Sequence, residues 1–385
     1  MTKVLMVSML FPPNFGGAAV QSLRLAKGLT DKGLNVEFVA DNGAQQTVIN
    51  DSYEGITVAR LKTYSNDIHS KFRELMFCIK LFLFVISRPD IKIIHFHSVR
   101  GFELFLFPFF RMIGKKILLK LTLVDSDDPL TFKRRRLLSP LYMWGLKAAH
   151  SMAAISEELK HRAIATGIEA NCVHKIFNGF DEKNFFIPDD LLKKTLRKQL
   201  QIDESALVFL SIGKVEHRKG YDLLIESFFW IQQKLPNAQL LIVGPGNDER
   251  NVFYNELCKS ITEKKLRNVI FVGKKNNIHE YTKAVDAFLF CSRQEGFGTV
   301  LIEAMACGLP TLAMNIEGVT EDIITDFRTS GINYSHQPED FAKDALELIH
   351  QADKQHILKA TEELKQRFSI TNIADQYVNL YRSIL

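Results

Sequence analysis

Strand-length apolar runs alternate with helix-length segments along the first half of the chain. The runs contain mostly Val, Ile and Leu with little polar alternation, which is typical of strands buried on both faces of a parallel sheet. Helical segments are predicted at 17–32 and 71–87. The predicted strands lie at 4–8, 36–40, 91–96, 116–121 and 151–155. This βαβ rhythm indicates a mostly parallel sheet covered by helices on both sides.

The rhythm stops near residue 178 and then starts again. Asn178-Gly179 and Pro188 favour turns, and a charged helical stretch follows at 189–201. The second series predicts helices at 220–234 and 298–307 and strands at 207–212, 239–243, 269–272 and 287–290. A chain of 385 residues is also too long for one ordinary core. We therefore expect two doubly wound, Rossmann-like α/β domains at about 1–177 and 178–369.

Composition excludes several classes of function. A net charge of +5 is low for a nucleic-acid-binding protein, so we expect no nucleic-acid partner. The five cysteines are scattered and form no CxxC pair, which argues against a disulfide framework and against a zinc site. The first residues indicate a buried strand and lack the features of a signal peptide. These features predict a cytoplasmic protein.

The most specific motif follows the predicted strand 287–290 and leads into a helix. It reads Glu295-Gly296-Phe297-Gly298-Thr299, with Glu303 further along the helix. Glycines allow a ligand to approach the backbone, and a helix N-terminus presents free N–H groups to it. Two carboxylates beside such a loop suit the hydroxyls of a sugar and a ribose. The alternative is a tight strand–helix turn with two exposed glutamates.

Two further loops leave a strand for a helix. Gly213-Lys214 and Lys219 follow the strand at 207–212, at the sheet edge where open α/β sheets bind ligands. The two lysines suit a diphosphate, although a solvated basic turn has the same composition. Gly16-Gly17 precedes the first helix and lets a phosphate approach the backbone. The spacing is not GxGxxG, so a nicotinamide site is not indicated.

These motifs together resemble the retaining glycosyltransferases of family four, which have the GT-B fold. The resemblance covers nearly the whole chain. It implies two Rossmann-like domains facing a central cleft, an N-terminal acceptor-binding domain, a C-terminal nucleotide-sugar-binding domain, and a last helix at 370–385 that crosses back. Further matching segments are Asn178-Gly179-Phe180-Asp181, Glu317-Gly318 with Glu321, and Phe368-Ser369 with Tyr381.

The resemblance assigns roles to the motif residues. Glu295, Lys214 and Lys219 are expected to be catalytic, with Glu295 on the sugar and the lysines on the leaving diphosphate. Glu303 is expected to bind the ribose. The remaining residues expected to bind the donor are Gly16, Gly17, Gly213, Gly296, Phe297, Gly298 and Thr299.

The chain departs from the family pattern at two places. Lys214 stands where members often carry arginine, which keeps the charge but loses bidentate geometry. No histidine follows the strand at 116–121, where the sequence contains Asp125 and Asp127. Either aspartate takes the acceptor-side role, with Asp125 as the catalytic candidate, or the site uses no such group. The segment can also be an Asp-rich helix N-cap. His97 is a second acceptor-side candidate, and a structural histidine is its alternative.

We expect a glycosyltransferase that moves a hexose-type sugar from a UDP-, GDP- or ADP-sugar to a hydroxyl acceptor, with retention of configuration. The acceptor is expected to be a glycan or a lipid-linked precursor of a surface polysaccharide. We expect no cofactor and no metal, although Asp125-Ser126-Asp127 has the DxD spacing of a metal–diphosphate motif. Alternatives are a non-catalytic sugar-nucleotide-binding subunit and a GT-B-like sugar-nucleotide epimerase.

Two apolar segments suggest a membrane partner. The runs 75–86 and 102–110 are rich in Phe and Leu and too short to span a bilayer. Basic residues in or near them are Lys71, Arg73, Lys80, Arg88 and Arg111. Apolar insertion together with attraction to anionic lipid predicts peripheral binding at the cytoplasmic face of the cell membrane. The alternative is a pair of ordinary core helices.

Overall fold

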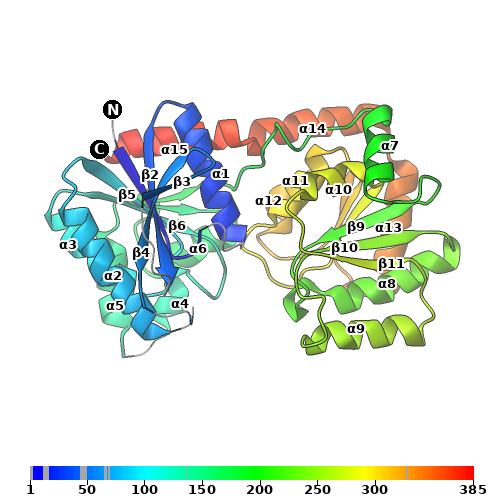
Figure 1. Ribbon diagram of the computed structural model, residues 1–385, viewed down its shortest axis with the longest axis horizontal. Coiled ribbons are helices and arrows are strands. Elements are labelled where there is room, and N and C mark those ends of the chain that lie inside the picture. The colour runs from blue at the N-terminus through cyan, green and yellow to red at the C-terminus, as the bar shows by residue number, and fades with distance from the viewer. Residues whose placement is uncertain are drawn as a thin grey trace. The chain divides into compact units, whose positions relative to one another are not determined.

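The computed structural model describes residues 3–385 except 12–16, 44–49, 65–66, 68–69, 136 and 327. The chain forms two compact units. Unit 1 contains Met1–Gly179 and Ile370–Leu385, and unit 2 contains Phe180–Ser369. The division falls two residues after the boundary expected from the sequence. Each unit is a doubly wound α/β domain, which confirms the predicted fold class (Figure 1).

Unit 1 contains an eight-stranded sheet in the order β3-β4-β2-β1-β5-β6-β7-β8. Neighbouring strands are parallel except β3 and β4, which are antiparallel. Its elements are β1 (Lys3–Ser8), α1 (Gly17–Asp31), β2 (Asn35–Gly43), β3 (Asn50–Tyr53), β4 (Ile56–Lys62), α2 (Lys71–Ile86), β5 (Ile91–His97), η1 (Phe102–Leu106), α3 (Phe107–Met112), β6 (Lys116–Leu121), α4 (Pro129–Lys133), α5 (Ser139–Ala148), β7 (Ser151–Ala154), α6 (Glu157–Ala165), η2 (Ala170–Cys172), β8 (Val173–Lys175) and α15 (Ile370–Ile384).

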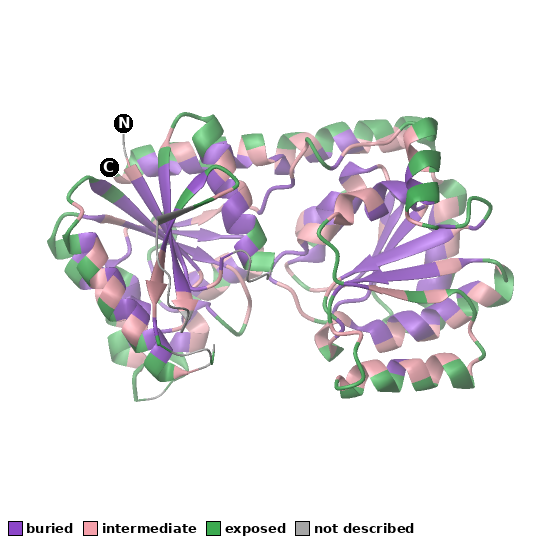
Figure 2. Ribbon diagram, viewed as in Figure 1, coloured by how far each residue is buried: buried purple, intermediate pink, exposed green. Residues whose placement is uncertain are grey.

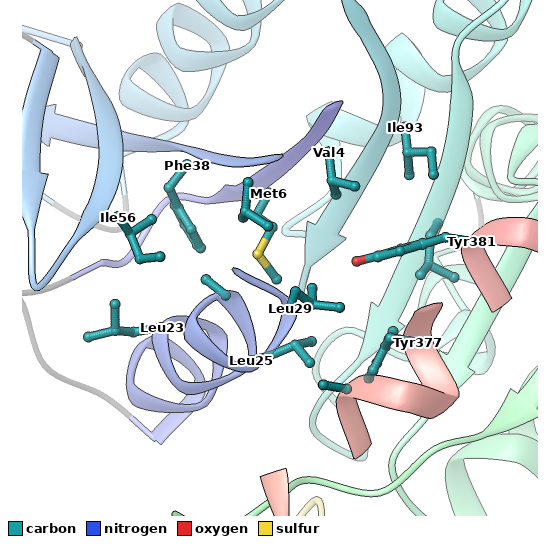
Figure 3. Close-up of a cluster of buried hydrophobic side chains, with 14 of the residues drawn as sticks. Val4, Met6, Leu23, Leu25, Leu29, Phe38, Ile56, Ile93, Tyr377 and Tyr381 are labelled. Carbon is teal, nitrogen blue, oxygen red and sulfur yellow. The ribbon is translucent and has the colours of Figure 1, made fainter. Parts of the chain in front are cut away.

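The two faces of the unit 1 sheet are covered by different helices. Side chains alternate across a strand, so neighbouring residues of β5 face opposite ways. His95 contacts Tyr381 of α15, whereas Phe96 packs against Phe107 of α3 with ring centroids 4.6 Å apart. Figure 3 shows Tyr377 and Tyr381 of α15 beside Leu29 of α1 in one apolar cluster. The C-terminal helix is therefore part of the unit 1 core.

Unit 2 contains a six-stranded, wholly parallel sheet in the order β11-β10-β9-β12-β13-β14. Its strands are mostly buried, as the purple arrows in Figure 2 show, apart from the edge strand β11, where Ile270 is exposed. Its elements are α7 (Asp190–Gln199), β9 (Val208–Ile212), η3 (His217–Lys219), α8 (Tyr221–Lys234), β10 (Gln239–Val243), α9 (Val252–Glu263), β11 (Val269–Gly273), α10 (Ile278–Ala284), β12 (Ala287–Phe290), α11 (Thr299–Ala306), β13 (Thr311–Met314), α12 (Thr320–Ile323), β14 (Ser330–Asn333), α13 (Pro338–Gln351) and α14 (Lys354–Phe368).

The two apolar runs singled out in the sequence differ in their burial. The first forms most of α2, which has one buried and one exposed apolar side. The second forms η1 and α3, and Leu104, Phe107 and Phe110 are fully buried there. No helix within the described part of the chain is both long enough and apolar enough to cross a bilayer.

Candidate active site

The Glu295–Gly298 loop joins β12 to α11 at the carboxyl edge of the unit 2 sheet. Gly298 adopts a φ of 89°, a left-handed conformation that glycine reaches without strain, and directly precedes the first residue of α11. No side chain caps this helix start. The Leu301 N–H donates to the Gly298 carbonyl at 2.9 Å, and the N–H groups of Thr299 and Val300 before it are placed to donate to an anionic or hydroxyl oxygen.

Glu295 and Lys219 lie in contact although 76 residues separate them. The ammonium of Lys219 donates to the Glu295 carboxylate, which also accepts from the Ser292 hydroxyl at 2.9 Å. The Arg218 guanidinium is 3.6 Å from the second carboxylate oxygen. The side chains of Lys219 and Glu295 are only 13% and 12% exposed. The structure therefore brings two of the expected catalytic residues into one partly buried charged pair.

Close backbone packing holds the loop after β9 in place. A Cβ at Gly244 would lie 1.9 Å from the Gly213 carbonyl oxygen, and a Cβ at Gly220 would lie 1.9 Å from the Cys291 carbonyl oxygen. The Tyr221 hydroxyl donates to the Gly213 carbonyl at 3.0 Å. The loops after β9, β10 and β12 therefore meet, and only glycine permits this approach. The sequence motifs did not indicate Gly244.

Lys214 differs from Lys219 in its surroundings. Its side chain is 62% exposed, and its ammonium lies 3.2 Å from the Glu216 carboxylate. An exposed ion pair of this kind contributes little to folding. Lys214 is thus the more accessible of the two cations that were expected to face a diphosphate.

Glu303 and Phe297 are both buried. Glu303 lies on α11 with 3% of its surface exposed. The Phe297 ring packs against Phe368, with centroids 5.8 Å apart. Its side chain therefore supports the loop from inside unit 2, and only its backbone remains available to a donor. Gly296 is also buried, whereas Thr299 is partly exposed at the start of α11.

The glycine pair expected to approach a phosphate belongs to unit 1. Gly17 begins α1 and is exposed, and a Cβ at this position would meet no atom within 4 Å. The space beside its backbone is therefore open. Gly16 lies outside the described residues.

The aspartates after β6 have distinct surroundings. The Asp127 carboxylate is buried and accepts from the Thr122 backbone N–H and hydroxyl and from the Leu123 N–H. Burial raises its pKa. Asp128 caps α4 through the Thr131 N–H, so the N-cap interpretation holds for that residue. Asp127 fixes the loop, which favours a structural role over contact with an acceptor.

Asp125 is the exposed member of this group. Its carboxylate is 50% exposed and accepts from the Arg162 guanidinium at 2.6 Å, and it has a φ of 60°. The DxD spacing therefore places one carboxylate outside and the other inside the protein. Within the described residues, no group of three or more His, Cys, Asp and Glu side chains is placed to hold a metal ion. The expected metal independence stays a prediction.

His97 lies in a buried polar cluster between β5, β6 and α15. The His95 Nδ1 is 2.7 Å from the Tyr381 hydroxyl, and the rings of His95 and His97 are 4.1 Å apart. Burial lowers the pKa of both histidines. Lys120 joins them, and burial lowers its pKa to about 7. A lysine inside the apolar strand KILLKL was the sequence signal for this cluster, and the motif analysis missed it.

Two family models match the chain. Residues 15–184 match the model described as "Glycosyltransferase Family 4", and residues 193–364 match "Glycosyl transferases group 1". The first model lies almost wholly within unit 1 and the second lies within unit 2.

Individual proteins are similar as well. The chain is 24% identical over 383 residues to N-acetyl-alpha-D-glucosaminyl L-malate synthase of Bacillus anthracis, covering 97% of this chain and 95% of that protein. It is 31% identical over 151 residues to the lipopolysaccharide core biosynthesis mannosyltransferase LpsB of Rhizobium meliloti, covering 39% and 42%. The crystal structure of Anabaena HepE in complex with UDP and glucose superposes with a TM-score of 0.79 at 20% identity over 100% of both chains. The last likeness confirms the predicted fold.

Proposed function

The chain belongs to the family 4 glycosyltransferases with the GT-B fold, and from this premise we propose that it transfers a sugar from a nucleoside diphosphate to a hydroxyl acceptor with retention of configuration. The observation that carries the proposal is the Lys219–Glu295 pair beside the start of α11. A carboxylate that binds sugar hydroxyls lies there next to a cation and free helical N–H groups that suit a diphosphate.

Each residue of the site has a role in this proposal. Glu295 binds hydroxyls of the donor sugar, and Lys219 and Lys214 stabilise the negative charge that develops on the leaving diphosphate. Glu303 binds the ribose from α11. The backbone of Gly213, Gly296, Gly298 and Thr299 lines the same loops of unit 2, and for Gly17 we keep the expectation that a phosphate approaches its open backbone.

For the donor we propose a UDP-sugar as the first candidate, because the structurally similar HepE has been crystallised with UDP. GDP- and ADP-sugars are the other candidate donors, and their binding is measured as well. For the acceptor we propose a glycan or a lipid-linked precursor of a surface polysaccharide or glycolipid, supported by the likeness to the lipopolysaccharide enzyme LpsB. Such an acceptor places the reaction at the cytoplasmic face of the membrane. Asp125, exposed after β6, is the proposed acceptor-side group.

A small hydroxy acid is the second acceptor candidate. A relative that aligns over 97% of the chain is by its name an N-acetyl-alpha-D-glucosaminyl L-malate synthase, whose product joins a sugar to malate. The exposed apolar surface of unit 1 favours the lipid-linked acceptor, because binding of a soluble dicarboxylate does not require an exposed apolar surface. Incubation of the enzyme with labelled donor and either malate or a membrane lipid extract separates the two candidates.

We propose that the reaction needs no metal, because Lys214 and Lys219 supply the positive charge that a divalent cation supplies elsewhere. We expect unchanged turnover after treatment with EDTA. Loss of activity in EDTA that Mn²⁺ restores would return Asp125 to the role of a metal ligand and contradict this part of the proposal.

Donor binding is tested by calorimetry with UDP-, GDP- and ADP-sugars. Glu303→Gln keeps the size of the buried side chain and removes its charge, and we expect roughly tenfold weaker donor binding from the lost charge-assisted hydrogen bond. Glu347→Gln, on the exposed side of α13, is the matched control. Equal affinity in wild type and Glu303→Gln would contradict the ribose role.

Binding without any turnover of donor would instead indicate a non-catalytic subunit, and interconversion of the donor without an acceptor would indicate an epimerase.

A further inference from the structure

Unit 1 carries a concentrated apolar surface on the helices opposite α1 and α15. Of the 21 large apolar side chains that are exposed among the described residues, 12 lie on or beside α2, α3 and α5. We call this set the α2–α3–α5 face. It consists of Phe72, Leu75, Ile79, Leu83 and Ile86 on α2, Phe109, Met112 and Ile113 on or beside α3, and Leu137, Leu138, Leu141 and Trp144 on or beside α5.

The face is continuous across the three helices. On α2 its residues recur at intervals of three or four, which places them on one side of the helix. The Phe82 ring on α2 lies 6.4 Å from the Phe109 ring on α3, and the Phe109 ring lies 6.2 Å from Trp144 on α5. Figure 1 shows α2, α3 and α5, in cyan and blue-green, on the same side of unit 1. Soluble proteins seldom expose a contiguous apolar patch of this kind without a partner.

The α2–α3–α5 face differs from the membrane surface expected from the sequence, which consisted of the runs 75–86 and 102–110 with the basic residues near them. Arg73 is buried and bound to Asp41, so it is not available at the surface. Most of the segment 102–110 is core, and of that segment Phe109 is the large apolar residue that contributes. The contribution of α5 and of the residues before it was not expected.

The exposed charges on the three helices of the face are all basic, and beside the helices basic residues outnumber Asp67 and Asp90, the exposed acids that flank α2. The helices α2, α3 and α5, every residue of which the structure describes, contain a single acidic residue, Glu74, and it is buried. Basic side chains at the surface of or beside the same helices are Lys71, Lys80, Arg111, Lys133, Arg134, Arg135 and Lys147. An apolar surface with a basic surround and no exposed acid on its own helices is complementary to an anionic lipid headgroup layer.

We propose that the α2–α3–α5 face docks on a bilayer that contains anionic lipid, with Phe109 and Trp144 at the level of the headgroups. The proposal deepens the proposed function, since it names the surface that brings unit 1 to a lipid-linked acceptor, but its physical basis is independent of catalysis. A second copy of the chain fits this face poorly. A two-fold interface would set the same basic residues against each other, which is electrostatically unfavourable.

The first test is flotation of the full chain with two kinds of vesicle, phosphatidylcholine alone and phosphatidylcholine mixed with phosphatidylglycerol. We expect binding only to the mixed vesicles at low salt, and its loss at high salt because exposed charges are screened. The triple variant Ile79→Ser, Leu83→Ser, Trp144→Ser should lose binding. The matched control replaces one Trp and two aliphatic residues that are exposed in unit 2, Leu191→Ser, Val252→Ser and Trp230→Ser, and should bind as wild type.

Charge is tested separately from apolar contact. Lys80→Gln, Arg111→Gln and Lys147→Gln together should weaken binding to the mixed vesicles, by about fivefold for each charge removed. The control is Lys198→Gln, Lys259→Gln and Lys343→Gln in unit 2, which changes the net charge equally. Circular dichroism and donor binding by calorimetry show whether each variant is folded, and they also report a failure of the proposed function separately from a failure of docking.

The second test uses the two tryptophans of the chain as reporters. In Trp230→Phe the fluorescence comes from Trp144 alone, and in Trp144→Phe it comes from Trp230 alone. We expect mixed vesicles that contain brominated lipid to shift the Trp144 emission to the blue and quench it, and to leave Trp230 unchanged. Absence of binding, equal quenching of both tryptophans, or a dimer in solution that the Ile79, Leu83 and Trp144 substitutions dissociate would each overturn the proposal.

Discussion

Lys214 and Lys219 carry the same charge in the candidate site but differ in burial and in their contribution to stability. Lys219 is partly buried against Glu295, whereas Lys214 is largely exposed. We expect Lys214→Ala and Lys219→Ala each to lower kcat by about 100-fold, because each removes positive charge from the developing diphosphate. Lys219→Ala should also cost roughly 1–3 kcal/mol of stability, since it leaves a partly buried carboxylate without its main partner.

Steady-state kinetics and urea unfolding measure these two effects separately. Lys214→Ala should unfold at the wild-type urea concentration, because exposed ion pairs contribute little. Lys234→Ala, a basic residue at the end of α8, is the control and should leave both quantities unchanged. Wild-type kcat in both loop variants would exclude the diphosphate role.

The buried Lys120 makes stability depend on pH. Burial lowers its pKa from 10.5 to about 7, so between these values the unfolded chain holds a proton that the folded protein has released. The contribution of Lys120 to the free energy of unfolding therefore rises as the pH increases from 7 to 10.5. We expect Lys120→Met to be more stable than wild type at pH 7, by up to several kcal/mol at about 1.4 kcal/mol per tenfold change in proton affinity.

Urea unfolding of the two proteins across this pH range checks the prediction. The advantage of Lys120→Met should be largest at pH 7 and should shrink toward pH 10.5. Both proteins contain the same other titratable groups, such as Tyr377 and Tyr381. The difference between their free energies of unfolding therefore cancels the contributions of those groups. A difference that stays constant over the range would mean that Lys120 keeps an ordinary pKa in the folded protein.

Motifs located the candidate site residues, but the burial of their side chains could not be inferred from motifs. Glu295 and Lys219 are in contact, yet no local pattern joins two residues that are 76 positions apart. Phe297 and Asp127 have side chains that suit a ligand, but packing against Phe368 and hydrogen bonds from Thr122 place them inside. The environment of a polar side chain is set by tertiary packing, which the sequence pattern does not contain.

At the scale of elements, glycines let the loops of unit 2 approach each other. Gly220 has a φ of 65°, and a Cβ there would lie 1.9 Å from the Cys291 carbonyl oxygen. We expect Gly220→Ala to destabilise the protein by more than about 2 kcal/mol, from backbone strain together with the clash. Donor affinity should fall as well, because the start of α8 must move away from the loop that carries Glu295.

Gly167→Ala is the control for backbone strain alone. Gly167 has a φ of 90°, and no atom lies within 4 Å of its Cβ position. This variant should lose only about 1 kcal/mol. Equal unfolding free energies for the two variants would show that the loops of unit 2 are not held by close backbone contact.

Strands with strong apolar runs were predicted well, and the strands that were missed lie at or next to a sheet edge. The predicted strand 287–290 coincides with β12, and the predicted helix 220–234 differs from α8 by one residue. The hairpin of β3 and β4 was not predicted, and neither were β13 and β14. Runs such as TLAM and SGIN are too short to show a period, and their partners in the sheet decide their conformation.

At the scale of the whole molecule, the βαβ rhythm and its interruption predict two doubly wound units. The helix at 370–385 joins unit 1 through Tyr377 and Tyr381, and the family resemblance indicated this return because the helical period alone does not say which core a helix covers. Unit 2 carries the candidate donor loops, and unit 1 carries the α2–α3–α5 face. The proposed function assigns a nucleotide sugar to the first and a lipid-linked acceptor to the second.

The central claim is that the chain transfers a sugar from a nucleoside diphosphate. The most direct measurement incubates the enzyme with doubly labelled UDP-sugar and a membrane lipid extract, and counts released UDP and acceptor-bound sugar in the same reaction. We expect the two products in equal amounts for wild type and neither product for Glu295→Gln, with Glu347→Gln active as the control. Release of nucleoside diphosphate without transferred sugar from every donor and acceptor tried, or full transfer by Glu295→Gln, would contradict the account.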